Sequence, residues 1–342
     1  MNDFVLYPFA LLCPFLLTTF LIPTAYRYWG RKFADKPAGN LKTHRKSVPA
    51  LGGLGIFAAT LIPLVIIRFC TAFPSGTLHY LRGIFIGGVL IFGLGLIDDL
   101  RKPQGVSIVT KLLVQATAAA ALMYYGVRVQ ILPHPYLAYP ITFLWLVGLT
   151  NAFNLLDIMD GLCVSQAVVC TLGLILIALP QEFIYVNLAA LALLGACLAF
   201  WPMNHRRKHK IFLGDSGATF LGFMLASLSI GNGYSSRSDC GFLAPLLILA
   251  VPLFDTAFVS LARLLKGKNP LKGSKDHIAL RLQKLGWTQR GILTAFIGAG
   301  VLFNLCAYAL TVSGPAVAVC LFIVTGLLLG LCALWLLSLP AD

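Results

Sequence analysis

The stretch YPITFLWLVGLTNAFNLLDIMDGL, residues 139–162, begins as a run of apolar side chains and ends with a polar group at every third position. These polar positions are Asn151, Asn154, Asp157 and Asp160. The apolar part approaches the roughly 20 residues that an α-helix needs to cross a lipid bilayer. The stretch therefore predicts a membrane helix whose end carries two amides and two carboxylates.

The composition extends this pattern to the whole chain. Of the 342 residues, 58% are hydrophobic and 11% are charged, and the mean hydropathy is +0.86. A soluble domain carries about 25% charged residues, so an ordinary soluble globule is excluded. We expect a single all-α polytopic membrane domain over residues 1–342, with about 10–11 transmembrane helices. The apolar runs that predict them are residues 4–26, 51–73, 81–97, 108–125, 139–156, 162–180, 183–203, 217–232, 242–264, 291–312 and 315–338.

The basic residues orient these helices, because the cytoplasmic connections of membrane proteins carry an excess of Lys and Arg. All 26 Lys and Arg residues lie in or beside the odd-numbered connections, except Arg68, Arg82, Arg128 and Arg237. This distribution predicts an outside N-terminus and a cytoplasmic C-terminus. It also accounts for the net charge of +14 without nucleic acid as a partner. The excess in the first and ninth connections would also suit a polyanionic substrate.

Two adjacent carboxylates, Asp98 and Asp99, follow the third apolar run. The C-terminus of a helix prefers cations because of the helix dipole, so two acids there favour a metal ion or a cationic partner. Lys102 and Lys111 are close enough in sequence to contribute. A charged end-cap on the helix is the alternative interpretation.

The polar groups of the opening stretch converge only if the backbone departs from a regular α-helix. Steps of three residues drift by about 60° each, so Asn151 and Asp160 would face opposite ways on such a helix. A tighter turn or an unwound segment would bring all four together, and such backbone is tolerated where it lines a polar cavity. Gly161 fits the end of a helix at this place. A solvated loop is the alternative.

A third segment, KIFLGDSGATFLGF at residues 210–223, leads into another apolar run. Gly214 and Gly217 flank Asp215 and Ser216, and glycines before a helix permit a phosphate to approach its N-terminus. The alternative is a helix cap by Asp215 or Ser216. Together the three segments predict magnesium-assisted chemistry on a pyrophosphate. Mg²⁺ binds through one or two carboxylates and completes its shell from phosphates.

At these motifs the chain resembles the polyprenyl-phosphate N-acetylhexosamine-1-phosphate transferase family. That family makes the first lipid intermediates of peptidoglycan, O-antigen, enterobacterial common antigen and teichoic acid. The resemblance runs in order along nearly the whole chain. It is carried by DKPAGNLKTHRKSVPALGG (35–53), DDLRK (98–102), KLLVQ (111–115), NAFNLLDIMDGL (151–162), FLGDSGATFLG (212–222) and VPLFDTAFVSLARL (251–264).

Two features depart from the family's pattern. Ile158 stands where glycine is usual in the motif at 151–162. The last cytoplasmic loop of the family often carries His-x-His-His, but KDHIALRLQKLGW (275–287) keeps only His277, with Arg281 four residues on. This difference favours the sugar-phosphate initiators over the alternative, the phospho-N-acetylmuramoyl-pentapeptide transferase of peptidoglycan synthesis, which carries a run of histidines there.

The resemblance implies a multi-pass enzyme of the bacterial cytoplasmic (inner) membrane, with its active site at the cytoplasmic face. It implies transfer of N-acetylhexosamine 1-phosphate from a UDP-N-acetylhexosamine to undecaprenyl phosphate, with release of UMP. Mg²⁺ would be the cofactor, with Mn²⁺ as a substitute. Membrane lipid is a further expected partner, and a homodimer is left open. A secondary transporter is the alternative from another class, but transporters place their acids near the bilayer midplane and often show internal repeats.

The resemblance also implies roles for individual residues. Asn154 and Asp215 would hold Mg²⁺. Independently of the resemblance, we expect Asn151 to be structural and to bond the backbone where the helix ends. The expected catalytic residues are Asp98, Asp99, Lys111, Asp157 and His277, with the two adjacent aspartates facing the lipid phosphate. The expected substrate-binding residues are His44, Lys102, Asp160, Phe212, Gly214 and Arg281, of which Phe212 and Asp160 would bind the uracil.

A base is of limited use to this reaction. A phosphate monoester has a second pKa of about 6, so the lipid phosphate is mostly dianionic at neutral pH and Asp98 would gain little by removing a proton. We therefore expect direct transfer. A covalent aspartyl intermediate is the competing mechanism.

Overall fold

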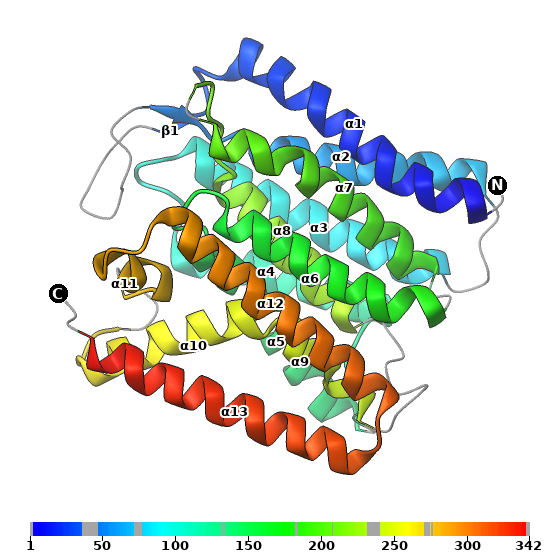
Figure 1. Ribbon diagram of the computed structural model, residues 1–342. Helices are drawn as coiled ribbons and strands as arrows, with labels where there is room; N and C mark the ends of the chain where they lie inside the picture. Colours follow the sequence, from blue (N-terminus) through cyan, green and yellow to red (C-terminus); the bar gives the residue numbers. More distant parts are fainter. Residues whose placement is uncertain are drawn as a thin grey trace. The chain divides into compact units, whose positions relative to one another are not determined.

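The computed structural model is built almost entirely of α-helices (Figure 1). It describes residues 3–35, 47–71, 77–130, 132, 134–181, 184–206, 208–230, 240–269, 274 and 276–339. The chain divides into two compact units, Met1–Asn232 and Gly233–Asp342. Each unit has its own helix packing, and one transferase domain over residues 1–342 stays a prediction.

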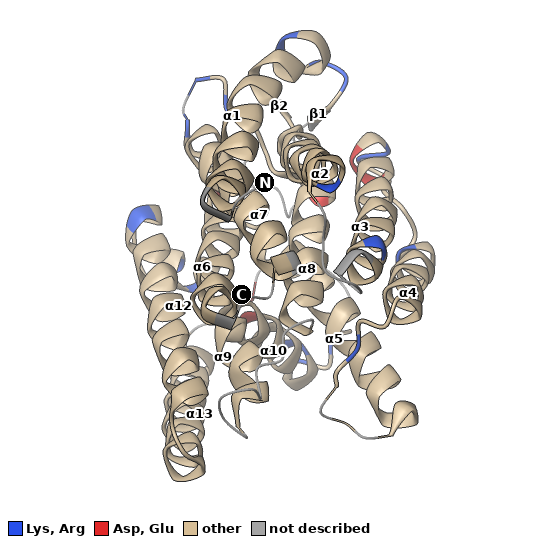
Figure 2. Ribbon diagram, turned by 90° about the vertical axis from the view of Figure 1, so that its right-hand side faces the viewer, with Lys and Arg blue, Asp and Glu red and all other residues tan. Residues whose placement is uncertain are grey.

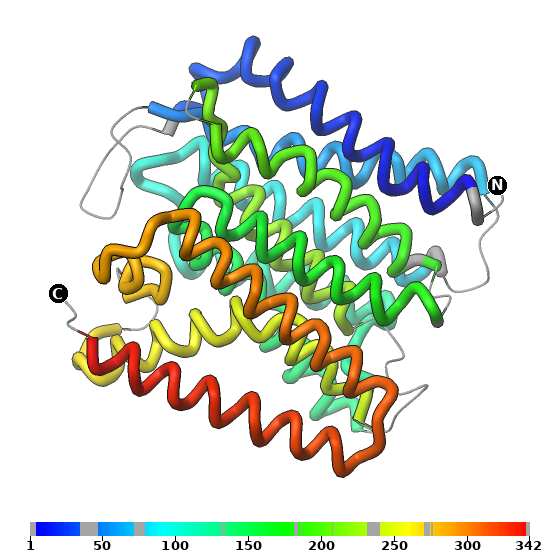
Figure 3. The backbone as a smooth tube through the Cα atoms, in the orientation of Figure 1, coloured from blue at the N-terminus to red at the C-terminus, as the bar shows by residue number. Residues whose placement is uncertain are grey.

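The first unit is a helix bundle with one short pair of strands. Its elements are α1 (Asp3–Trp29), β1 (Ala34–Asp35), β2 (Val48–Pro49), α2 (Gly52–Cys70), α3 (Thr77–Leu100), α4 (Ile108–Tyr124), α5 (Pro135–Leu156), α6 (Leu162–Ala178), η1 (Leu179–Gln181), α7 (Ile184–His205) and α8 (Gly214–Ile230). β1 and β2 are antiparallel, with Ala34 opposite Pro49 and Asp35 opposite Val48. Helices α1, α2 and α7 pack side by side (Figure 3).

The second unit packs around α12. Its elements are η3 (Gly241–Leu243), α9 (Ala244–Ile248), α10 (Ala250–Leu265), α11 (Ile278–Lys284), α12 (Gln289–Val312) and α13 (Pro315–Ser338). Helix α12 contacts η3 and each of the other four helices. Within the most apolar stretch of α13, only 11% is buried inside the protein, which suits a helix that faces lipid.

Each apolar run of the sequence coincides with a helix or with a bent pair of helices, which confirms an all-α polytopic membrane protein. In the described part of the chain, seven helices are long and apolar enough to cross a membrane, and a bent pair allows an eighth crossing. The seven are α1, α2, α3, α5, α7, α12 and α13. Helices α4, α6 and α8 have 17 residues each. The sides on which the termini lie stay a prediction.

The bent pair replaces the straight helix expected over residues 242–264. The segment Gly241–Ile248 meets α10 at an angle of 63°. Pro252 explains the break, because it has no N–H to donate to the carbonyl of Ile248, four residues earlier. The break makes this segment a broken span or a re-entrant loop.

Helix α8 is the centre of the first unit, where it packs against α2, α3, α5 and α6. Every residue of α8 is buried except Asp215. Glycines permit this packing: a Cβ on Gly95 of α3 would lie 2.4 Å from the Cα of Ser216, and a Cβ on Gly53 of α2 would lie 2.3 Å from the amide nitrogen of Gly217. The first turn of α8 is therefore held at backbone contact distance from two other helices.

Charged side chains lie mostly at helix ends and in connections, whereas the helix bodies carry few of them (Figure 2). This distribution is what a bilayer requires of the helices that cross it. Asp255 is an exception, because it lies within α10 and is buried. Both the ends of the first unit's helices and the surroundings of Asp255 are therefore candidate functional regions.

Candidate active site

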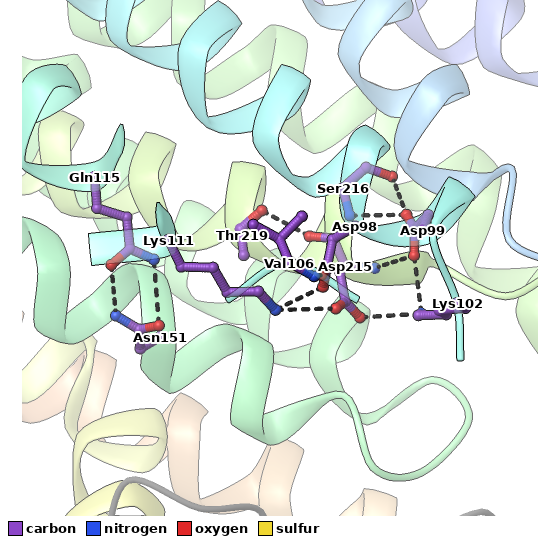
Figure 4. A network of polar contacts seen from close by, with 10 residues as sticks. All are labelled: Asp98, Asp99, Lys102, Val106, Lys111, Gln115, Asn151, Asp215, Ser216 and Thr219. Atoms are coloured by element: carbon purple, nitrogen blue, oxygen red, sulfur yellow. Dashed lines mark hydrogen bonds and ion pairs between the residues drawn. The ribbon is translucent and has the colours of Figure 1, made fainter. Parts of the chain in front are cut away.

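Five of the predicted residues of the first unit meet where three helix ends come together (Figure 4). Asp98 and Asp99 end α3, Lys111 lies in the first turn of α4, and Asp215 begins α8. Lys102 lies in the turn that follows α3. The chain brings together groups that are more than 100 positions apart, as in the ion pair of Lys102 with Asp215.

Asp98 is a buried carboxylate held by two donors. Its Oδ2 accepts a hydrogen bond from Lys111 Nζ at 2.6 Å, and its Oδ1 accepts one from the Val106 amide at 2.5 Å. Lys111 Nζ also lies 3.7 Å from Asp215 Oδ2. One ammonium group therefore lies between carboxylates from α3 and α8. Its positive charge offsets the unfavourable interaction of two acids with the C-terminal end of the α3 dipole.

Asp99 accepts four hydrogen bonds. Its Oδ1 accepts from Lys102 Nζ and from the Asp215 amide, both at 2.9 Å. Its Oδ2 accepts from the amide of Ser216 at 3.0 Å and from the Ser216 hydroxyl at 2.7 Å. The sequence predicts that a phosphate approaches the N-terminus of this helix. In the structure, the amides of Asp215 and Ser216 at that end instead donate to a carboxylate of α3. Gly214 has φ of +78°, and its substrate-binding role stays a prediction.

Asp215 is the part of this cluster that reaches the surface. Its side chain is 26% exposed, and its carboxylate lies 3.2 Å from Lys102 Nζ. It shares the ammonium group of Lys111 with Asp98. Three carboxylates share two ammonium groups, so the cluster carries a net negative charge that favours a further cation.

Asn154 and Asp157 lie at the end of α5, a helix that packs against α8. The helix ends at Leu156, and Asp157 follows as its C-cap. Neither side chain hydrogen-bonds to any residue that the structure describes, and both are half-buried. Burial, with a smaller contribution from the negative charge of Asp215, raises the pKa of Asp157 to about 7. A half-buried carboxylate without a donor, near other carboxylates, is suited to binding a cation.

Of the four polar groups of the opening stretch, Asn151 and Asp160 pair with different residues, and Asn154 and Asp157 have no hydrogen-bond partner among the described residues. The helix is regular through Leu156 and residues 157–161 are not helical, so the backbone departs from a helix only after Asn154. Asn151 instead exchanges hydrogen bonds with Gln115 of α4: its Nδ2 donates to Gln115 Oε1 at 2.9 Å, and Gln115 Nε2 donates to its Oδ1 at 3.2 Å. Asn151 thereby joins α4 to α5.

Asp160 and Phe212 are joined by Lys210, a residue that sequence reasoning missed. Lys210 Nζ forms an ion pair with Asp160 Oδ2, and it lies 5.1 Å from the centroid of the Phe212 ring. The Phe212 backbone is anchored to the end of β2, because its amide donates to the carbonyl of Pro49 at 2.9 Å. The predicted uracil-binding pair therefore lies around one ammonium group. The only sign of this role of Lys210 in the sequence was its position two residues before Phe212.

The turn after α5 is fixed by Asn204 of α7, a second residue that the sequence did not indicate. Asn204 Oδ1 accepts from the amide of Gly161 at 2.5 Å, and its Nδ2 donates to the carbonyl of Ile211 at 2.9 Å. Gly161 has φ of +79°, and a Cβ there would lie 2.2 Å from His205 Nε2, so glycine is required. Ile158 is not among the residues with positive φ, so the backbone at this position does not require the family's glycine.

The second unit holds the remaining predicted residues that the structure describes. His277 Nδ1 lies 2.7 Å from Asp255 Oδ2, and Asp255 Oδ1 accepts from the Ile278 amide at 3.0 Å. Both side chains of this pair are buried. A carboxylate of α10 therefore fixes both the imidazole and the start of α11. His277 keeps its catalytic role as a prediction, and His44 lies outside the described residues.

Arg281 is buried within the second unit. Its Nη1 donates to the carbonyl of Leu336 at 2.7 Å, its Nη2 donates to Asp276 Oδ1 at 3.1 Å, and its guanidinium carbon lies 5.1 Å from the Phe258 ring centroid. These contacts join α10, α11 and α13. Burial alone would raise the pKa of Asp276, but a hydrogen bond from Lys266 and the nearby positive charges lower it to about 2. The substrate-binding role of Arg281 stays a prediction.

The donors of the first unit fit a magnesium ion. Among the described residues, no three His, Cys, Asp or Glu side chains are disposed to ligate one metal. Mg²⁺ does not need such a cage, since it binds through one or two carboxylates and takes its other ligands from water and phosphates. The exposed carboxylate of Asp215 and the unpartnered oxygens of Asn154 and Asp157 provide hard ligands of this kind.

Comparison with known proteins relates the chain to transferases of lipid phosphates. Residues 81–232 match the model of glycosyl transferase family 4. The chain is 32% identical over 288 residues to a probable undecaprenyl-phosphate N-acetylglucosaminyl 1-phosphate transferase of Bacillus subtilis, covering 81% of this chain and 76% of that protein.

Two further relatives have similar names. A decaprenyl-phosphate N-acetylglucosaminephosphotransferase of Mycolicibacterium smegmatis is 28% identical, over 76% of this chain and 71% of that protein. An undecaprenyl-phosphate alpha-N-acetylglucosaminyl 1-phosphate transferase of Escherichia coli is 26% identical, over 80% of this chain and 77% of that protein. The region matched by the family contains the whole cluster of Figure 4.

Proposed function

Because this chain belongs to the polyprenyl-phosphate N-acetylhexosamine-1-phosphate transferase family, we propose that it transfers N-acetylglucosamine 1-phosphate from UDP-N-acetylglucosamine to undecaprenyl phosphate. The names of the relatives support this sugar and this lipid, and they do not favour the pentapeptide transferase. The observation that carries the proposal is the cluster of Asp98, Asp99 and Asp215 around Lys102 and Lys111. Such a cluster suits a site that binds a pyrophosphate together with a divalent cation, because the carboxylates attract the cation and the ammonium groups lie beside it.

In the proposed reaction an oxygen of the lipid phosphate attacks the β-phosphorus of the sugar nucleotide. The bond from that phosphorus to the bridging oxygen breaks, and UMP leaves with the bridging oxygen and its electron pair. The lipid phosphate needs no base, because it is mostly dianionic at neutral pH. Catalysis then depends on position and charge. Lys111 and Lys102 provide the positive charge, and Asp98 orients Lys111.

We propose Mg²⁺ as the cofactor, held by Asp215, Asn154 and Asp157, with Mn²⁺ as a substitute. When bound, the ion neutralises charge on the pyrophosphate and polarises its phosphorus–oxygen bonds. The half-buried side chains of Asn154 and Asp157 support this assignment, since their oxygens have no hydrogen-bond donor among the described residues.

The uridine is proposed to bind where Asp160 and Phe212 lie. The Phe212 ring offers a face for the base, and the Asp160 carboxylate is an acceptor for the N3–H of uracil. In the described structure both are in contact with Lys210, so the base would replace Lys210 on the ring. Lys210 would then be free to contact a phosphate.

The test uses purified protein with undecaprenyl phosphate, Mg²⁺ and labelled UDP-N-acetylglucosamine, UDP-N-acetylgalactosamine or UDP-N-acetylmuramoyl-pentapeptide in separate reactions. Label extracted into organic solvent, with equimolar UMP, is expected for UDP-N-acetylglucosamine. Asp215→Asn is expected to abolish the transfer. Label from the pentapeptide nucleotide alone would instead support the peptidoglycan enzyme, and no label from any donor would remove the enzymatic proposal.

A further inference from the structure

The adjacent residues Asp98 and Asp99 have separate sets of partners. We infer that Asp99 is a positioning residue: its carboxylate caps the N-terminus of α8 from α3, and so fixes Asp215. In this assignment Asp99 is neither a metal ligand nor a proton acceptor. The inference rests on the proposed function, in which Asp215 binds the cofactor, but the contacts that carry it do not depend on the reaction.

The hydrogen bonds of Asp99 leave its carboxylate without free capacity. An ionised carboxylate offers about four lone-pair sites to donors. Asp99 uses four: the amides of Asp215 and Ser216, the Ser216 hydroxyl and Lys102 Nζ. A metal ion or a transferred proton would have to displace one of these bonds.

The N-terminus of α8 has a specific need for this carboxylate. The first amides of a helix have no partner within the helix, and water reaches them poorly when the helix is buried. Every residue of α8 except Asp215 is buried. A negative charge at this end is also favoured by the helix dipole. Asp99 therefore does for α8 what an N-cap residue does for its own helix, although it belongs to α3.

The packing around Asp99 is built to bring its carboxylate to α8. A Cβ on Gly214 would lie 2.6 Å from Asp99 Oδ2, so a side chain there would push the carboxylate away. Gly95 lies one turn before Asp99 on α3, and a Cβ on it would lie 2.4 Å from the Cα of Ser216. Glycines on both helices thus keep the space that the cap needs, independently of the hydrogen bonds.

The cap determines where the Asp215 carboxylate lies. With its own amide bonded to Asp99, Asp215 is placed 3.2 Å from Lys102 and 3.7 Å from Lys111. Loss of the cap would free the first turn of α8 and move Asp215 relative to both lysines. We expect weaker cofactor binding from such a change, with no change in the proton chemistry of the site.

The experiment compares Asp99→Asn with the matched variant Asp98→Asn, whose carboxylate bonds to no backbone amide of α8. Amide hydrogen exchange of residues 214–217 is measured by mass spectrometry on the full chain in detergent. Asp99→Asn is expected to speed exchange of these amides about tenfold, and Asp98→Asn to leave it within about twofold. Ser216→Ala, which removes only the hydroxyl donor, is expected to give an intermediate increase.

Activity supplies the second readout. In Asp99→Asn the Mg²⁺ concentration for half-maximal transfer is expected to rise about tenfold, while the pH profile keeps its shape and excess Mg²⁺ restores most of the rate. Normal exchange combined with lost turnover, or a displaced pH profile, would overturn the inference and make Asp99 a catalytic residue. The exchange measurement needs no turnover, so a chain that transferred no sugar would still show whether Asp99 caps α8.

Discussion

Lys111 Nζ lies 2.6 Å from Asp98 Oδ2 and 3.7 Å from Asp215 Oδ2, so one side chain of α4 holds together carboxylates from α3 and α8. All three side chains are at least partly shielded from water. The carboxylates of Asp98 and Asp215 repel each other, most strongly where water is scarce, and the ammonium group of Lys111 between them offsets that repulsion. The position of Lys111 is therefore as important to the cluster as its charge.

Replacement of Lys111 tests this role. Lys111→Met keeps the length of the side chain and removes its charge, so the transfer rate is expected to fall by about 100-fold or more. Lys111→Arg keeps the charge and is expected to retain more activity than Lys111→Met. Measured kcat and KM for the sugar nucleotide would check both. Near-normal kcat in Lys111→Met would show that the ammonium group is not needed.

The glycine contact between α3 and α8 predicts a loss of stability. Gly95→Ala would force a Cβ to within 2.4 Å of the Ser216 backbone, and is expected to destabilise the protein by about 1–3 kcal/mol. Gly93→Ala is the matched control on the same helix, because its Cβ would meet nothing within 4 Å. Thermal unfolding in detergent should show a lower midpoint for Gly95→Ala alone. Equal midpoints for the two variants would contradict the close packing.

The amide pair of Gln115 and Asn151 is expected to set the position of α4 against α5. Gln115→Leu and Asn151→Leu should each destabilise the protein, because each leaves the remaining amide without its partner on the other helix. The double variant should recover part of the loss, with a coupling of about 0.6–1.7 kcal/mol. Unfolding of the four proteins gives this coupling. Additive losses would mean that the pair contributes nothing specific.

Asp157 predicts a pH dependence of the metal-free protein. Its pKa of about 7 lies above the value of about 3.9 for an unfolded chain, so the folded state binds the proton more tightly. Its stabilising contribution is full below about pH 4 and is lost as the pH rises through about 7. In EDTA the unfolding temperature should therefore fall between about pH 5 and about pH 8. Asp157→Asn should show a smaller fall, and an identical profile would contradict the assignment.

The buried pair of Asp255 and His277 predicts a large loss of stability when it is broken, at a place outside the carboxylate–lysine cluster. Asp255→Ala leaves the imidazole and the Ile278 amide without their partner, and is expected to cost about 3–5 kcal/mol. Asp255→Asn keeps an acceptor for the amide and should cost less. Asp276→Asn is the control, since it removes a carboxylate of the same unit that is more exposed. Thermal unfolding checks the order of the three.

The apolar runs were sufficient to predict the helices, because a side chain in lipid must be apolar over the length of a span. The convergence of Asp98, Asp99 and Asp215 was also predictable, since each lies at a predicted membrane edge on the same side. The break before α10 was not predicted, although Pro252 was visible in the sequence. A proline at that place in an apolar run is compatible with either a kink or a turn.

Which donor meets which acceptor was beyond the sequence. Lys210 was counted only as one charge of a basic connection, and Asn204 ends an otherwise apolar helix with no periodic signal. The role of Asp99 follows from contacts with residues 116 and 117 positions away. The composition of a segment and the spacing of its apolar residues predict which side chains are buried. The hydrogen bonds and ion pairs between distant residues depend on how helix ends meet in three dimensions.

The two-lysine, three-carboxylate cluster also constrains the order in which reactants arrive. A sugar nucleotide brings its own negative charges to a site whose charges already sum to a negative value. Its encounter with the enzyme is favoured only after a divalent ion has arrived, or together with one. Initial-rate kinetics are therefore expected to show no productive binding of nucleotide before metal, and an uncomplexed nucleotide should be a poor competitor of the metal-bound form.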